Sequence, residues 1–221
     1  MSSVPLPPLP PAFRVSDADV RPGGRSMLDV LVDDHHTLAM LYEQLAADDP
    51  AAPDRRPLVD VLVAVLSRHL SAEEQYLYPT VRAVLPDGDQ VADHELAEDQ
   101  AMLHALRQLH TMPREDPGFA GLVDAVGQRV REHSHRASRE IFPRLRELCE
   151  EHELIRLGNR VEIARSAAPS RPHPATPATP PANKLVDPAL GVLDKVRDAV
   201  TRRTTWPEDL APGGFVGEVA G

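Results

Sequence analysis

Apolar residues recur every three or four positions along four long stretches of the chain. This spacing gathers the apolar side chains on one face of a helix, so each stretch is predicted to be an amphipathic helix. The first begins at Ser26, which forms a capping-box pattern with Asp29, and none of the stretches alternates as a strand does. The predicted helices cover approximately residues 26–48, 54–86, 90–112 and 117–151.

Four long helices joined by short connections pack best as an up-down-up-down bundle. The predicted fold class is therefore all-α: a four-helix bundle, a shorter fifth helix over about residues 153–166, and extended tails at both ends. Both tails are rich in proline, which interrupts helices and central strands. The predicted division of the chain is a Pro-rich N-terminal tail (1–24), the bundle (25–166), a Pro-rich linker (167–186) and a C-terminal region (187–221).

The C-terminal region is predicted to contain a short amphipathic helix. Asp187 and Pro188 are typical of an N-cap followed by proline at the first helical position. Apolar residues then follow at helical spacing, namely Leu190, Leu193, Val196 and Val200. We expect this helix to be a strap that folds back onto the bundle. The alternative is a helix that binds a protein partner, which the sequence does not identify.

The most informative stretch lies in the second predicted helix, where Glu73 follows His69 by four residues. Residues at this spacing lie one above the other on a helix, here on its apolar face. Pro79 follows and is expected to kink the helix. The fourth predicted helix repeats the ten-residue step from histidine to aromatic–proline, starting from His133, but it has Ala137 in the place of the glutamate. The two halves of the bundle therefore look like a duplicated helical hairpin.

Each of the four predicted helices places one histidine on its apolar face, and two of them add a glutamate one turn later. These residues are His35, His69, Glu73, His94, Glu98 and His133. Burying such groups without compensation costs several kcal/mol per charge, out of the ~5–15 kcal/mol that stabilises a domain. A metal ion offsets this cost, and imidazole with carboxylate but no thiolate points to iron, manganese or zinc. The sequence thus predicts a metal site between the helices rather than a structural polar core.

Composition excludes several classes of partner. The chain has 34 Asp and Glu against 24 Lys and Arg, a formal charge of −10, so we expect no nucleic-acid partner. Its single cysteine, Cys149, excludes an internal disulfide framework and is typical of a reducing compartment. No apolar run approaches the ~18 residues that span a bilayer, and no signal-peptide pattern opens the chain. We therefore expect a cytoplasmic protein without a membrane partner.

The order of the histidine and glutamate motifs over residues 27–150 resembles the haemerythrin-like family, also called the HHE cation-binding domain. The Pro-rich C-terminal extension resembles that of actinobacterial members. The resemblance implies a four-helix bundle that holds a non-haem di-iron centre bridged by carboxylates and an oxygen atom. Family members bind or sense dioxygen, handle iron or nitric oxide, or decompose peroxide. By matching position, the implied iron ligands are His35, His69, Glu73, His94, Glu98 and His133.

The chain departs from the family pattern in the fourth helix. The family's carboxylate ligand there falls at Ala137 or Ser138, and neither residue can bridge two metals. We therefore expect one firmly bound iron and a second that is bound weakly or not at all. Asp34 and Asp93, each directly before a ligand histidine, are candidates for tuning the metal.

The preferred hypothesis is a non-haem iron protein whose core site binds or senses a small oxidant such as dioxygen, peroxide or nitric oxide. An iron-dependent enzyme that decomposes peroxide or oxidises iron would use the same residues, and the sequence leaves that alternative open. A third hypothesis is an interaction scaffold whose metal site has decayed and whose C-terminal helix is the working part. No residue stands out as catalytic.

Overall fold

The computed structural model describes residues 23–46, 56–113, 115–173, 182–201 and 203–210, and every regular element within these ranges is helical. The prediction of an all-α fold is confirmed. The elements are α1 (Met27–Ala46), α2 (Arg56–Ala72), the π-helical turn η1 (Glu73–Leu77), α3 (Tyr78–Val84), α4 (Gly88–Thr111), α5 (Phe119–Arg136), the π-helical turn η2 (Ala137–Ile141), α6 (Phe142–Leu148), α7 (Glu151–Ala167), α8 (Ala182–Thr201) and the 3₁₀ turn η3 (Pro207–Asp209).

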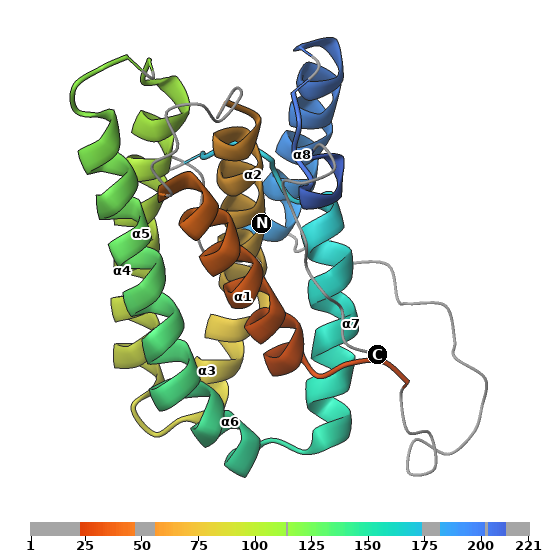
Figure 1. Cartoon of the computed structure of the whole chain (residues 1–221). Helices are drawn as coiled ribbons and strands as arrows, with labels where there is room; N and C mark the ends of the chain where they lie inside the picture. Colours follow the sequence, from red (N-terminus) through yellow and green to blue (C-terminus); the bar gives the residue numbers. More distant parts are fainter. Residues whose placement is uncertain (1–22, 47–55, 114, 174–181, 202, 211–221) are drawn as a thin grey trace.

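Four antiparallel columns form the bundle (Figure 1): α1, α2 with α3, α4, and α5 with α6. α1 packs against α2 and α5, and α4 packs against the same two neighbours. α7 lies along α1 and α2, and α8 packs against α7. This is the predicted bundle with its extra helix, although α7 extends somewhat further at both ends than the expected 153–166.

The start of the first helix follows the capping pattern in the sequence. The backbone N–H of Asp29 donates a hydrogen bond to Ser26 Oγ at 3.1 Å. This bond satisfies one of the amides that a helix start leaves without a partner.

The second and fourth columns each contain one π-helical turn directly before an aromatic–proline pair, Tyr78–Pro79 or Phe142–Pro143. Proline has no N–H for the helical ladder, and its ring crowds the carbonyl four residues back. A π turn inserts one extra residue into the helix and makes room for the ring. In place of the kink expected at Pro79, the helix widens locally into a π turn. The fourth column has the same π turn before Pro143.

The apolar core has two parts, and a polar layer separates them. One part joins the second half of α1, α2, the second half of α4 and the first half of α5. The other joins the first half of α1, α3, α6 and α7. Along α1 the boundary falls between Leu31 and Leu38, and along α5 it falls between Val130 and Ala137. Between these positions, Asp34 and His35 on α1 and His133 on α5 are buried polar residues.

The C-terminal helix α8 differs from the prediction in two ways. It begins at Ala182 rather than at Asp187, so Pro188 lies inside the helix, where it removes one backbone hydrogen bond. Two of the apolar side chains expected to pack on the bundle also point away from it, since Leu193 and Val200 are 66% and 79% exposed. These exposed side chains leave the partner-binding alternative open.

Charged contacts attach α8 to the bundle. Asp194 and Asp198 are buried, and their carboxylates lie 3.8 and 2.6 Å from the Arg171 guanidinium. The apolar spacing of the sequence could not reveal this orientation, because the arginine that selects the acidic face lies on another segment. The helix thus folds back onto the bundle, as expected, but its polar face makes the contact.

The chain then crosses from α8 to α2. Arg203 Nε lies 3.1 Å from Asp60 Oδ1, and Arg68 Nη1 donates to the Thr205 carbonyl at 2.7 Å. The Arg68 guanidinium also stacks over the Trp206 ring, 3.9 Å from its centroid. These contacts tie the segment after α8 to the middle of α2.

Three sequence-based predictions fall outside the described residues: the N-terminal tail up to residue 22, the start of the second predicted helix at residue 54, and residues 174–181 of the Pro-rich linker. Among the described helices, none combines the length and the hydropathy that a membrane span requires.

The packing of α7 on the start of α1 makes a testable prediction at Gly158. A methyl group at this position would lie 2.0 Å from the Arg25 carbonyl oxygen, and backbone cannot give way as a side-chain tip can. Gly158→Ala should therefore lower the free energy of unfolding by ~1–3 kcal/mol, measured by thermal denaturation.

Gly121→Ala in α5 is the matched control, because nothing lies within 4 Å of a methyl group placed there. Alanine favours helix over glycine by up to ~1 kcal/mol, so this variant should melt at the same temperature or slightly higher. Equal melting temperatures for the two variants would contradict the close approach of α7 to the start of α1.

Candidate metal centre

Three histidines and one glutamate meet in the polar layer of the bundle. His35 comes from α1, His69 from α2, Glu73 from η1 and His133 from α5. One ligand atom of each side chain lies within 4.8 Å of those of the other three. All four side chains are buried, with exposures of 5% or less. Four separate helical segments therefore bring together a cluster with the composition of a metal site.

Glu73 lies at the centre of this cluster. Its Oε1 is 3.4 Å from His69 Nε2 and 4.0 Å from His35 Nε2. Its Oε2 is 3.1 Å from His133 Nε2. The Nε2 atoms of His69 and His133 are 3.3 Å apart. The imidazoles thus direct nitrogen atoms toward one carboxylate.

Some atoms of the cluster find no hydrogen-bond partner in the described part of the chain: both ring nitrogens of His35, Oε1 of Glu73 and Nδ1 of His133. A buried polar atom without a partner costs about 1–3 kcal/mol. Imidazole nitrogen and carboxylate oxygen are ligands that iron, manganese and zinc accept. A metal ion bound among these atoms would satisfy Nε2 of His35 and Oε1 of Glu73 together, so the residues fit the predicted metal.

A carboxylate and an arginine support His69 from behind. Asp34 Oδ2 lies 3.2 Å from His69 Nδ1, and Arg165 of α7 lies 2.8 Å from the other oxygen of Asp34. A histidine whose Nδ1–H donates to a carboxylate has its Nε2 lone pair free for a metal, and the ring is held in place. Asp34 was expected to tune the metal from its place next to His35; in the structure it contacts His69 instead.

His133 has a similar arrangement behind it. Its Nδ1 lies 3.8 Å from Glu95 and 3.7 Å from Asp99, both buried in α4. Glu95 in turn accepts two hydrogen bonds from Arg136, at 2.8 and 3.3 Å. His69 and His133 therefore each have a carboxylate near Nδ1, and an arginine pairs with that carboxylate.

The two aromatic residues that precede the prolines also contact the cluster. The Tyr78 hydroxyl donates to Asp99 at 2.6 Å and lies 3.2 Å from Glu73 Oε2. The Phe142 ring stacks on His35, with centroids 6.0 Å apart and an angle of 8° between the planes. The two π-helical turns thus aim one polar and one apolar ring at the same site.

Residues 26–167 match the sequence profile of the family described as "Hemerythrin HHE cation binding domain". This match spans more than half of the chain and includes all four residues of the cluster. The chain belongs to the haemerythrin HHE family. A haemerythrin-like domain with this buried cluster is a metal-binding domain.

Two relatives support the assignment. The chain is 24% identical over 181 residues to an uncharacterized hemerythrin-like protein of Schizosaccharomyces pombe, a match that covers 81% of this chain and 87% of that protein. The fold of this chain is similar to that in the crystal structure of a hemerythrin HHE cation-binding domain-containing protein from Mycobacterium kansasii. That likeness has a TM-score of 0.55 and 22% identity, and it covers 63% of this chain and 87% of the other.

The third histidine–glutamate pair of the sequence lies elsewhere in this haemerythrin-like bundle. His94 is exposed, and Glu98 pairs with Arg129 at 3.2 Å on the surface. The buried residues of α4 are instead Gly88, Ala92, Glu95, Asp99, Met102, Leu103, Leu106 and Leu109. The expected apolar face was therefore wrong by about one residue.

The spacing of the buried leucines could have shown the correct face of α4. Leu109, Leu106 and Met102 step back by three or four residues to Asp99 and then to Glu95. The histidine–glutamate pattern drew the interpretation to the neighbouring face. Asp93, also expected near the metal, pairs with Arg82 on the surface.

Burial and neighbouring charges set the protonation of the metal-free cluster. Burial lowers the pKa of His69, but Glu73 and Asp34 outweigh it and raise the pKa to about 10. Burial raises the pKa of Glu73, but His69 and His133 outweigh it, and the pKa lies well below its usual range. Burial, reinforced by the other two imidazoles, holds the pKa of His35 well below its usual range. His35 is thus a neutral imidazole, the form that binds metals.

Asp34→Asn tests the support behind His69. The amide is a weaker acceptor than the carboxylate for the Nδ1 proton, so we expect metal affinity to fall ~10–100-fold, measured by competition with a chelator. Asp33→Asn is the matched control, because the neighbouring Asp33 side chain is 56% exposed and pairs with Arg25. An equal loss in both variants, or none in Asp34→Asn, would mean that Asp34 does not position His69.

The metal-free protein is expected to be more stable at pH 6 than at pH 9. Folding raises the pKa of His69 from 6.5 to about 10 and that of Asp99 from 3.8 to about 7. Such groups stabilise the fold fully below their unfolded pKa and lose that contribution as pH rises through the folded pKa. The melting temperature measured by calorimetry should therefore decrease from pH 6 to pH 9.

The metal-loaded protein should show the opposite trend in acid, because protons compete with the metal for the same nitrogen atoms. Metal release is expected as pH falls below ~6. Parallel dependence of the melting temperature on pH for the loaded and metal-free forms would count against a metal at this cluster.

Proposed function

We propose that the chain is a cytoplasmic non-haem iron protein that binds dioxygen, peroxide or nitric oxide at the His35, His69, Glu73 and His133 cluster. The main support is the convergence of four buried ligand side chains, some of whose atoms have no other partner in the described chain. Imidazole with carboxylate suits iron, and the family resemblance favours it over manganese and zinc. Bound iron would supply a redox-active Lewis acid with positions open to a small ligand.

The protein would shape the site by excluding water and holding the ligands still. Phe142 covers one face of His35, and Ala137, 2% exposed, contributes only a methyl group to the wall. A dry site strengthens the attraction between charged groups inside it. Tyr78 would fix Glu73 and Asp99 relative to each other, because its hydroxyl contacts both carboxylates.

The ligand set favours one iron over two. His133 directs Nε2 to the cluster and Nδ1 to Glu95 and Asp99. Two hydrogen bonds from Arg136 already neutralise Glu95. With Ala137 in the fourth column, that column adds no carboxylate to the cluster.

Iron reconstitution tests this function directly. Protein loaded anaerobically with ferrous iron and then desalted should retain about one iron per chain, measured by metal analysis and absorption spectroscopy. Glu73→Gln should retain little. Glu98→Gln is the matched control and should retain as much as the wild type, because Glu98 pairs on the surface.

Each alternative outcome has a clear meaning. A wild-type protein that takes up no iron would favour the interaction scaffold. Loss of iron in Glu98→Gln but not in Glu73→Gln would reverse the assignment of the glutamate ligands. With iron bound, turnover of peroxide or of ferrous iron would favour the enzyme, and stable binding of dioxygen or nitric oxide without turnover would favour a sensor or carrier.

The variant Ala137→Glu tests the one-iron interpretation. Ala137 is buried one turn beyond His133, so a glutamate there would point toward the cluster. Iron content should rise toward two per chain, with the near-ultraviolet absorption of an oxygen-bridged pair. Arg139→Glu, at an exposed position of the same turn, should leave the iron content unchanged. Two irons in the wild type, unaffected by Ala137→Glu, would mean that another residue supplies the second carboxylate.

A further inference from the structure

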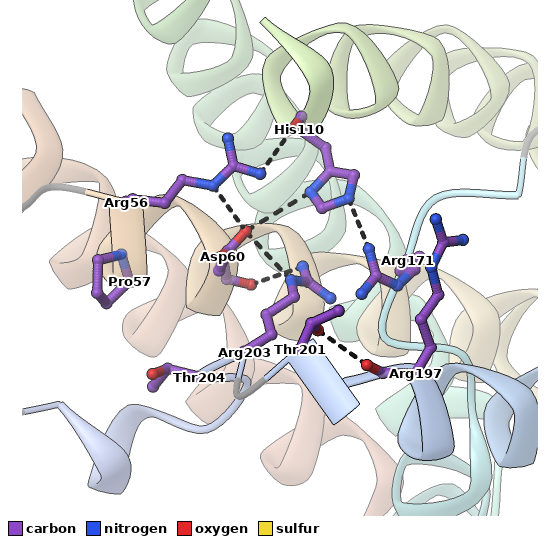
Figure 2. Close-up of a pocket in the computed structure, with 9 residues that line it drawn as sticks. All are labelled: Arg56, Pro57, Asp60, His110, Arg171, Arg197, Thr201, Arg203 and Thr204. Carbon is purple, nitrogen blue, oxygen red and sulfur yellow. Dashed lines mark hydrogen bonds and ion pairs between the residues drawn. The ribbon is translucent and has the colours of Figure 1, made fainter. Parts of the chain in front are cut away.

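A cavity of about 410 Å³ lies away from the metal centre, where α2 begins and α4 and α8 end (Figure 2). Four of its nine lining residues are arginines and one is a carboxylate. This local excess of positive charge contrasts with the formal charge of −10 on the whole chain. The lining residues are Arg56, Pro57, Asp60, His110, Arg171, Arg197, Thr201, Arg203 and Thr204.

The carboxylate in the wall is already engaged by cations. Asp60 Oδ1 lies 3.3 Å from Arg56 Nε, 3.1 Å from Arg203 Nε and 3.6 Å from His110 Nδ1. Burial raises the pKa of Asp60, but His110 and Arg203 outweigh it and the pKa lies below its usual value. Asp60 is therefore a fixed anion whose charge the surrounding groups balance.

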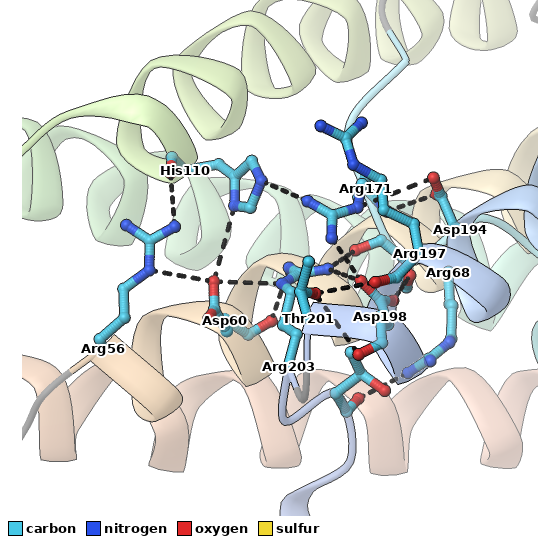
Figure 3. A network of polar contacts seen from close by, with 12 residues as sticks. Arg56, Asp60, Arg68, His110, Arg171, Asp194, Arg197, Asp198, Thr201 and Arg203 are labelled. Atoms are coloured by element: carbon cyan, nitrogen blue, oxygen red, sulfur yellow. Dashed lines mark hydrogen bonds and ion pairs between the residues drawn. The ribbon is translucent and has the colours of Figure 1, made fainter.

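Two further carboxylates reach the network from α8 (Figure 3). Asp194 and Asp198 pair with Arg171, and Asp198 also lies 3.3 Å from Arg203 Nη1. Arg171 in turn donates to His110 Nε2 at 2.8 Å. Because a guanidinium only donates, that nitrogen accepts, and the His110 proton lies on Nδ1, facing the carboxylate of the wall.

The arginines that line the cavity outnumber, by one, the carboxylates that pair with them among the described residues. Four arginines line the cavity, and among the described residues three carboxylates pair with them, namely Asp60, Asp194 and Asp198. Arg197 is exposed, and its guanidinium contacts no carboxylate within the described ranges. The surplus charge is thus located on the α8 side of the cavity.

The helix ends around the cavity are compatible with an anion. At the end of α8, Thr201 Oγ1 donates to the Arg197 carbonyl at 2.8 Å, and Arg203 N–H donates to the Asp198 carbonyl at 2.9 Å. These bonds occupy carbonyl oxygens that would otherwise repel an anion. α2 begins at the cavity with the positive end of its dipole, whereas α4 and α8 end there with their negative ends. The arginines, rather than the helix dipoles, therefore supply the positive charge of the cavity.

The wall also limits what kind of anion fits. Pro57 is its one apolar residue and His110 its one aromatic ring, so the lining offers little surface on which a nucleobase could stack. Guanidinium groups match the oxygen atoms of phosphate in a bidentate manner, and threonine hydroxyls can donate to the same oxygens. These features favour a compact ligand with several charged oxygens.

We propose that this cavity is a binding site for a small phosphate-class oxyanion, with Arg197 as the main free cation and Arg171 as its neighbour in the wall. Free phosphate and the phosphate group of a small metabolite share this chemistry. Such an anion would contact α2, α8 and residues 203–204 together. It would therefore fasten the C-terminal extension to the bundle.

The test is calorimetric titration of the full chain with sodium phosphate, at constant ionic strength maintained with sodium chloride. Saturable binding and a rise in melting temperature are expected. Arg197→Gln should weaken phosphate binding about tenfold or more, because it removes the surplus charge without breaking a described ion pair. Arg160→Gln is the matched control: it changes an exposed arginine of α7 outside the cavity and should bind phosphate as the wild type does.

Three results would overturn the proposal: no saturable phosphate binding, unchanged binding in Arg197→Gln, or equal weakening in both variants. The last would indicate attraction to surface charge in general. Phosphate held by a metal in the core would be unaffected by either substitution, so the comparison separates the two sites. Parallel titrations identify the source: tighter binding of glycerol 3-phosphate than of free phosphate favours a metabolite, and weaker or equal binding favours phosphate itself. Binding of citrate without phosphate would reject the phosphate class.

Discussion

The fold is built around a layer of buried charge in the middle of an apolar bundle. Three imidazoles and a carboxylate meet there, and two separate apolar clusters close the layer from both ends. Such a layer is costly unless each charge is balanced. Charged neighbours farther from the cluster balance this layer. Asp34 lies next to His69 and Glu95 next to His133. Arg165 then pairs with Asp34, and Arg136 pairs with Glu95. The two arginine side chains are 31% and 22% exposed, so each chain of charges ends at solvent.

One backbone device, used twice, gives the two halves of the site different properties. Each π-helical turn brings its first residue and the aromatic five positions later to the same region of the core. In the first half these are Glu73 and Tyr78, joined by a 3.2 Å contact. In the second half they are Ala137 and Phe142, and the ring packs on His35 instead. The duplication preserves the scaffold, while one half supplies a ligand and the other an apolar wall.

The sequence predicted the bundle and named all four residues of the cluster, together with His94 and Glu98, which lie outside it, because helix and motif depend on local spacing. Helical periodicity gave the four columns, and a histidine on each apolar stripe pointed to His35, His69 and His133. Periodicity located α4 correctly but left its face ambiguous, since His94 and Glu95 are adjacent and only packing decides between them. For α8 the apolar residues were the wrong guide, because Arg171 lies on a separate segment and selects the acidic face. Elements whose orientation depends on distant charges could not be predicted in this way.

The C-terminal extension lies closer to the cluster of histidines and Glu73 than the family match alone would indicate. That match ends at residue 167, yet Trp206, Pro207 and Glu208 line a cavity of about 330 Å³ that reaches Asp34. Asp34 is one hydrogen bond from His69. The opposite wall includes Arg68, the residue before this histidine, whose stacking on Trp206 joins the extension to the ligand helix. The extension therefore forms one wall of a cavity that also includes Asp34, the carboxylate that supports His69.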